Sequence, residues 1–350
     1  MPELPDVPGV PDLAGALEVV ETFLLGEAPS LTRVQVAEQA GVPLEIASEL
    51  WRLLGFPTQD DDEVAFTSLD VQALRDTRAL IDLGILGAER QAALVRTWGR
   101  SYARLAEWQT TLLADLALES GSDTGATLAK FTDEVLPRVD ALQSYVWRRH
   151  LVSAGSRLLA VEAPGSPVSR MAVVFVDIVG YTSRSKTLSE SELVEWLEYF
   201  ESETLGLVVD HGGRIIKNIG DEVLLVADDL SAAVEIALLM TARGSDDGDL
   251  FPAVRAGIAY GDVVSRLGDV FGPTVNIAAR LTSVARPGTV VVDRGAYEAL
   301  SGRIHDDADD APDSHGPESG APYSLRRMRR VSVKGYPRLA AWALRPTDRA

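Results

Sequence analysis

The chain has 350 residues, of which 46% are hydrophobic, and a formal net charge of −19 at pH 7. The absence of cysteine excludes disulfide bonds and thiolate metal sites, and the acidic surface disfavours general binding to nucleic acid and anionic membranes. No apolar run approaches the ~20 residues of a membrane-spanning helix. Residues 1–14 are Pro-rich and acidic, unlike a signal peptide. We therefore expect a cytoplasmic protein of two domains, with residues 1–14 as a flexible tail.

The first domain, residues 15–159, is predicted to be helical throughout. Two apolar stripes with three- and four-residue spacing each indicate a long helix. The first consists of Leu94, Trp98, Tyr102, Leu105, Trp108 and Leu112, and the second of Val135, Val139, Leu142 and Val146. The second stripe leads into a cationic cluster, Arg148-Arg149-His150. Residues 160–170 contain two Pro and a Gly, so they are predicted to be the linker to the second domain.

Part of this first domain has the pattern of a DNA-binding motif. Residues 30–57 resemble a helix-turn-helix, and residues 63–74 resemble the continuation found in some bacterial transcription regulators. DNA-binding modules must neutralise phosphate charge, but residues 31–80 contain four basic and nine acidic side chains. The charge balance therefore favours a helical packing module over DNA binding.

The second domain, residues 171–346, alternates short β-type runs with helical patterns, which is typical of a compact α+β or α/β domain. Strands are predicted at residues 171–177, 214–220, 222–227, 254–264, 288–293, 329–335 and 340–344. Helices are predicted at 189–209, 231–243 and 275–286, and the segment 303–323, rich in Asp, Gly and Pro, is predicted to be a loop.

Two carboxylates stand at the ends of predicted strands in this domain. Asp177 closes an apolar run typical of a strand buried on both faces, where an ionised carboxylate is costly unless something compensates its charge. Asp221 lies in a predicted hairpin. If the hairpin lies beside the first strand, the two carboxylates converge and could bind two divalent cations that carry a nucleotide phosphate chain. The alternatives are a capping residue for Asp177 and an ordinary turn for Asp221.

The segment 268–281 adds a possible phosphate contact. Asn276 and Arg280 are four residues apart in the predicted helix 275–286 and share one face of it. Arg280 could reach a phosphate from there, and the alternative is an ordinary pair of surface side chains.

Four segments, FVDIVGYT, KNIGDEV, GDVFGPTVNIAAR and VKGY, together resemble class III nucleotidyl cyclases in order and approximate spacing, over roughly residues 170–345. The resemblance implies an α+β domain with a ferredoxin-like core, a head-to-tail homodimer, and two active sites shared between chains, each with two Mg²⁺ or Mn²⁺ ions. Carried over by position, it implies metal binding by Asp177, Ile178 and Asp221, purine recognition by Lys217 and Asp269, ribose orientation and transition-state stabilisation by Asn276 and Arg280, and terminal phosphate binding by Lys334.

The residues at the purine positions favour ATP. Lys217 can only donate hydrogen bonds and ionised Asp269 can only accept them, which matches the N1 acceptor and 6-amino donor of adenine. Guanine reverses both groups, and a site that leaves buried polar groups unmatched can reject an analogue strongly. The expected reaction is attack of the ribose 3′-oxygen on the α-phosphorus, which gives 3′,5′-cyclic AMP and pyrophosphate without a protein base.

One position departs from the family pattern. Asp262 stands where many members have an arginine that assists the phosphates. Either Lys334 and Arg266 suffice for the triphosphate, or triphosphate binding is weaker.

The first domain resembles, less specifically, the helical regulatory domain of mycobacterial-type pH-responsive cyclases. That resemblance implies autoinhibition relieved by mild acid, and His150, at the joint between the domains, is the candidate switch because histidine titrates near neutral pH. Two other functions fit the sequence less well. A diguanylate cyclase carries a Gly-Gly-acidic-acidic-Phe hairpin, whereas the hairpin here reads IGDEV. The VNIAAR helix also has no counterpart in that class of enzyme. A non-catalytic nucleotide sensor fits less well because the full set of site residues is present.

Overall fold

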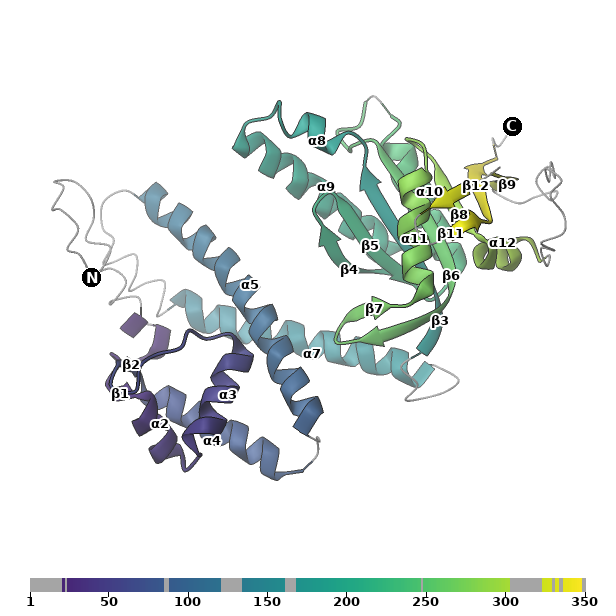
Figure 1. Ribbon diagram of the computed structural model, residues 1–350. Helices are drawn as coiled ribbons and strands as arrows, with labels where there is room; N and C mark the ends of the chain where they lie inside the picture. The colour runs from purple at the N-terminus through teal and green to yellow at the C-terminus, as the bar shows by residue number, and fades with distance from the viewer. Residues whose placement is uncertain are drawn as a thin grey trace. The chain divides into compact units, whose positions relative to one another are not determined.

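The computed structural model divides into two compact units, Met1–Leu159 and Ala160–Ala350 (Figure 1). Each unit has its own hydrophobic core. Within the residues that the structure describes, no helix is both long and apolar enough to cross a membrane. The described residues are 21–22, 24–84, 88–120, 134–160, 168–246, 248–302, 323–328, 331–333 and 336–347.

The first unit contains two short helices joined by a tight turn, as the helix-turn-helix pattern predicted. Helix α2 (Arg33–Ala40) is followed by Gly41, whose φ of 68° lies in the left-handed region that glycine adopts without strain. Helix α3 (Leu44–Leu54) comes next. Helix α4 (Ser68–Asp82) packs against α2. The acidic balance of this segment still argues against DNA binding.

The prediction that residues 15–159 are helical throughout is wrong at two short segments. Strand β1 (Leu31–Thr32) pairs antiparallel with β2 (Val64–Phe66). Phe66 packs its ring against Trp51, with ring centroids 4.9 Å apart, so aromatic burial accompanies strand pairing at this point.

The two long helices predicted from apolar stripes are α5 (Ala88–Ser120) and α7 (Leu136–Ala160). Several of their large apolar side chains are exposed in the single chain, among them Tyr102 and Trp108 on α5 and Leu142 and Val146 on α7.

The second unit is built on a βαββαβ core. Its elements are β3 (Val168–Ile178), α9 (Glu190–Asp210), β4 (Gly213–Ile219), β5 (Glu222–Ala227), α10 (Leu230–Arg243) and β6 (Val254–Arg266). The strand order is β4-β5-β3-β6 and every neighbouring pair is antiparallel, which is the ferredoxin-like arrangement. The predicted α+β fold with a ferredoxin-like core is therefore confirmed.

Further strands extend this sheet beyond the core. Strand β8 (Val290–Asp293) runs parallel to β6, and β12 (Ala341–Pro346) and β9 (Tyr323–Arg327) follow it. Strand β7 (Asp269–Phe271) forms a hairpin with the end of β6, and β10 (Val331–Val333) pairs with β11 (Tyr336–Leu339) in a separate small sheet. The remaining helices are α8 (Tyr181–Arg184), α11 (Pro273–Val284) and α12 (Arg294–Ser301).

Both faces of β3 are covered, as its unbroken apolar run predicted. Val174 and Val176 face a core that includes residues of α9, α10 and α12, whereas Val173 and Phe175 face a second core that includes residues of α11. Successive side chains of a strand point to opposite faces, so Asp177 shares the α11 face with Phe175.

Helix α11 is held very close to the sheet. A Cβ atom on Gly257 of β6 would lie 2.4 Å from the backbone nitrogen of Thr282, so only glycine fits beneath the helix there. The Thr282 hydroxyl donates to the Phe175 carbonyl at 3.2 Å, and the Thr274 hydroxyl donates to the Asp262 carbonyl at 2.8 Å. These contacts fix both ends of the helix that carries Asn276 and Arg280.

Helix α12 begins at Asp293, a buried carboxylate that carries a pH-dependent cost. Its Oδ1 accepts from the Ala296 and Tyr260 backbone amides at 2.8 and 3.1 Å, and burial raises its pKa to about 6 in spite of these bonds. The folded state therefore binds the proton of Asp293 more tightly than the unfolded state does. As a result, the contribution of Asp293 to the free energy of unfolding falls as pH rises from about 4 to about 6, and it is constant above that.

We expect Asp293→Asn, which keeps an acceptor oxygen but cannot ionise, to escape this loss. The stability of the variant relative to the wild type should rise by roughly 2–3 kcal/mol between pH 4 and pH 6.5, at about 1.4 kcal/mol per pKa unit. Chemical denaturation of both proteins from pH 4 to pH 7.5 measures it. Parallel stability profiles would contradict the elevated pKa of Asp293.

Candidate active site

The centre of the candidate site is a row of three charged side chains across the sheet. Asp177, near the end of β3, is in register with Glu222 of β5 on one side and with Arg255 of β6 on the other. In-register residues of antiparallel strands present their side chains on the same face, so the three lie side by side on the face that carries α11.

Asp221 joins this row through the turn between β4 and β5. Gly220, with φ of 65°, makes the turn possible, and Asp221 follows it immediately before Glu222. The Ile178 amide donates to the Asp221 carbonyl at 3.2 Å, which ties the turn to the end of β3. The structure thus brings Asp177, Ile178 and Asp221 together at one end of the strands.

The electrostatics of the row follow from burial and mutual repulsion. Burial raises the pKa of Asp177, the neighbouring charge of Asp221 adds to this, and Arg255 opposes it. Burial together with the charges of Asp177 and Asp221 raises the pKa of Glu222 to about 7. Three carboxyl groups therefore repel one another here.

Arg255 is the residue that compensates Asp177 in this structure. Its Nε and Nη2 atoms lie 2.7 and 2.6 Å from Oδ2 of Asp177, whose side chain is only 15% exposed. The charge compensation that the sequence analysis required for Asp177 is thus supplied in part by an arginine from the adjacent strand.

The donor atoms present fit a hard divalent cation. Among the described residues, no three His, Cys, Asp or Glu side chains form a ready-made metal cage. Asp177 and Asp221 instead supply two carboxylates at the C-terminal end of β3. Mg²⁺ is commonly held by one or two carboxylates and completed by substrate phosphates, so an all-oxygen pair of this kind suits Mg²⁺ or Mn²⁺.

The two residues predicted to read the purine are in direct contact. Nζ of Lys217, on β4, lies 2.5 Å from Oδ2 of Asp269, the first residue of β7. Oδ1 of Asp269 accepts from the Val270 amide at 2.8 Å, which fixes the orientation of the carboxylate. Both side chains are partly exposed, at 39% and 29%, so a ligand can reach them.

Helix α11 presents the other two predicted residues. Asn276 and Arg280 are both exposed and lie one turn apart. Their side chains make no hydrogen bond or ion pair with any described residue, so both are available to a ligand.

Four further positions were named in the sequence analysis, namely Lys334, His150, Asp262 and Arg266. Lys334 lies outside the described residues. His150 is exposed on α7 of the first unit. Asp262 is exposed on β6 in register with Arg170, and Arg266 is exposed near the end of the same strand.

Sequence reasoning missed Glu222 and Arg255. The signal for Glu222 was available, since it directly follows Asp221. Arg255 is 78 residues from Asp177, and only the strand register brings the two together.

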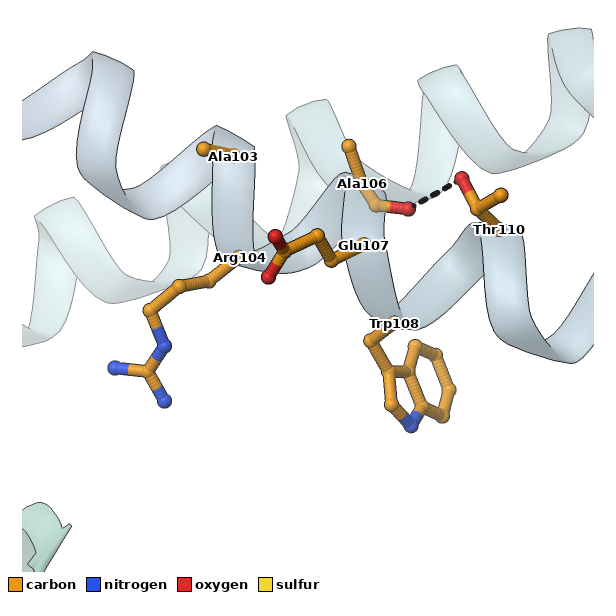
Figure 2. A pocket seen from close by; sticks show the side chains of 6 residues that line it. All are labelled: Ala103, Arg104, Ala106, Glu107, Trp108 and Thr110. Carbon is orange, nitrogen blue, oxygen red and sulfur yellow. Dashed lines mark hydrogen bonds between the residues drawn. The ribbon is translucent and has the colours of Figure 1, made fainter. Parts of the chain in front are cut away.

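The first unit has a surface depression of its own. It is lined by Ala103, Arg104, Ala106, Glu107, Trp108 and Thr110, all from α5 (Figure 2). None of its lining residues is one of the site residues predicted from the sequence, so we do not assign catalysis to it.

Comparison with known proteins identifies the second unit. The model of a family described as the adenylate and guanylate cyclase catalytic domain matches residues 164–335. An adenylate cyclase of Streptomyces coelicolor is 39% identical over 286 residues, which cover 80% of this chain and 74% of the relative. A pH-sensitive adenylate cyclase of Mycobacterium tuberculosis is 31% identical over 301 residues, which cover 81% and 71%.

A solved guanylate cyclase domain from Catenaria anguillulae, in complex with GTP, is 20% identical with a TM-score of 0.42, over 51% of this chain and 97% of that chain. The relatedness rests on the sequence matches, which confirm the resemblance seen in the four segments. The chain is therefore an enzyme of the class III adenylate and guanylate cyclase family.

Proposed function

We propose that this protein is an adenylate cyclase that converts ATP into 3′,5′-cyclic AMP and pyrophosphate, at two equivalent sites of a cytoplasmic homodimer. The observation that carries the choice of ATP is the Lys217–Asp269 pair, which offers one donor and one acceptor at the purine positions. Relatives named adenylate cyclase at 39% identity support the same choice.

The proposed chemistry depends on where charge develops. Asp177 and Asp221, with Ile178, would hold two Mg²⁺ or Mn²⁺ ions per site, which supply acidification of the 3′-hydroxyl and neutralisation of the leaving pyrophosphate. Arg280 would face the charge that builds on the α-phosphate oxygens. Asn276 would orient the ribose for in-line attack, and Lys334 would bind the terminal phosphates.

We further propose that the first unit inhibits the second at neutral pH and releases it on mild acidification. The similarity to a relative named pH-sensitive adenylate cyclase, which extends over 81% of this chain, supports this idea. His150 is the candidate switch residue because it is exposed on α7, next to Arg148 and Arg149.

One assay tests the function and the regulation together. Cyclic nucleotide formation is measured with ATP or GTP and with Mg²⁺ or Mn²⁺, for the full chain and for residues 160–350, from pH 5 to pH 8. Cyclic AMP from ATP is the expected product, and cyclic di-GMP or no product would overturn the proposal. Identical pH profiles of the two proteins would count against a switch in the first unit, and a His150→Ala profile equal to wild type would clear that residue alone.

Exchanging the purine-reading pair should change base selectivity. We expect Lys217→Glu combined with Asp269→Cys to lower kcat/KM for ATP by at least ~10²-fold and to raise GTP turnover relative to ATP. Adenine bound against these side chains would cover polar groups that it cannot match, which costs binding free energy. Lys186→Glu, the same lysine-to-glutamate exchange at an exposed position of this unit, is the control and should behave as wild type. An unchanged ATP preference in the double variant would mean that the purine is read elsewhere.

A further inference from the structure

We propose that Arg255 is a positioning residue of the metal site, an internal counter-ion that holds Asp177 while no metal is bound and competes with the metal for it. The inference rests on the proposed function, because it assumes that Asp177 is a metal ligand. It adds a role for Arg255, which the register of β6 against β3 places beside Asp177 and which belongs to none of the four sequence motifs.

The guanidinium of Arg255 is anchored on two sides. Two of its nitrogens, Nε and Nη2, point at one oxygen, Oδ2 of Asp177, at 2.7 and 2.6 Å. Its third nitrogen, Nη1, donates to the carbonyl of Ser283, near the end of α11, at 3.5 Å. The side chain of Arg255 is 33% exposed and that of Asp177 is 15% exposed, so the pair is partly shielded from solvent.

The charges around this pair explain why a cation is needed. Asp177 lies between Glu222 and Arg255 in the row, and Asp221 stands beside Glu222 in the turn. Without Arg255, the metal-free site would hold three carboxyl groups close together with no cation among the residues in register with Asp177. Arg255 therefore stabilises the metal-free arrangement and keeps Asp177 aimed at the site.

The same contact must oppose metal binding. A divalent cation at Asp177 would stand a few ångströms from the guanidinium, and like charges at that separation repel. The two N–H groups also occupy lone pairs of Oδ2 that a metal could use. Arg255 thus weakens metal binding while it preserves the geometry of the empty site, and removing its charge should tighten metal binding.

The test uses the full chain with Arg255→Met, which keeps an unbranched apolar stem and removes the charge. Mn²⁺ binding without nucleotide is followed by the electron paramagnetic resonance signal of free Mn²⁺, and thermal midpoints are recorded with and without Mn²⁺. We expect ~3–10-fold tighter Mn²⁺ binding, a lower metal-free Tm and a larger Mn²⁺-induced rise in Tm than in wild type. Arg214→Met is the matched control and should match wild type in Mn²⁺ affinity, because Arg214 pairs with the exposed Asp228 at the other end of the β4–β5 hairpin.

Weaker or unchanged Mn²⁺ binding by folded Arg255→Met protein would overturn the inference. If that variant does not fold, Arg255→Lys replaces it, since lysine keeps the charge with a single donor group. It should bind Mn²⁺ no more weakly than wild type, and weaker binding would overturn the inference. Asp177→Asn separates the two hypotheses. If Asp177→Asn abolishes Mn²⁺ binding but Arg255→Met leaves it unchanged, only the role of Arg255 as counter-ion is wrong. If Asp177→Asn binds Mn²⁺ as wild type does, the assignment of Asp177 as a metal ligand is wrong as well.

Discussion

Arg280→Ala is expected to lower kcat for cyclic AMP formation by ~10²–10³-fold while KM for ATP changes little, because a group that acts on developing charge stabilises the transition state more than the ground state. The structure provides the physical basis for the expectation. Arg280 is exposed and has no partner among the described residues, so its charge is not already committed to the protein. Steady-state kinetics with ATP and Mg²⁺ or Mn²⁺ measure both constants.

The matched control for this substitution is Arg286→Ala. Arg286 is an exposed arginine just beyond the end of the same helix, and its loss should leave both constants near wild type. If Arg280→Ala raises KM with kcat unchanged, the residue contributes to substrate binding in general. It would then not stabilise the transition state, and the proposed role would be wrong.

The sequence predicted the core of the second unit because its patterns were long and periodic. The run at 171–177 forms β3, and the predicted helix 189–209 corresponds to α9, which begins after the capping residue Ser189. The elements of this unit that were missed are shorter, with three to eight residues each, namely α8, β7, α12, β9 and β11. Segments of that length contain too few residues to show a period, so only packing against neighbours defines them.

The composition of the site was predictable only in part. Asp177 and Asp221 could be proposed because each stands at a predicted strand end, and they converge once the β4–β5 hairpin lies beside β3. Arg255 could not be proposed, because its contact with Asp177 depends on the register of β6 against β3. A shift of that register by one residue would place Arg255 on the opposite face of the sheet.

The Gly257 position shows a similar limit. The sequence shows a glycine at this position, but not why a larger residue would fail there. The reason is the close approach of Thr282, on α11 and 25 residues further along the chain. The close packing of α11 then sets where Asn276 and Arg280 stand relative to the sheet. Such positional effects arise from tertiary packing, which residue types alone do not specify.

Two inactive variants are expected to restore activity to each other if the sites are shared between chains. Lys217 and Asp221 are four residues apart across one hairpin, with Lys217 in β4 and Asp221 in the turn that follows. If each site takes metal ligands from one chain and purine contacts from its partner, these two residues serve different sites. A two-fold dimer then contains two equivalent composite sites.

Asp177→Ala and Arg280→Ala chains should each be nearly inactive alone, since each variant dimer lacks one essential group at both sites. In a mixed dimer, one site lacks both groups, whereas the other combines Asp177 of one chain with Arg280 of its partner and is complete. Random exchange makes about half of the dimers mixed, each with one working site of two, so ~25% of wild-type activity should return. Co-refolding the two variants and assaying cyclic AMP measures this, with differently tagged chains to confirm mixing. Activity that stays at the level of the separate variants despite confirmed mixed dimers would mean that each chain carries its own complete site.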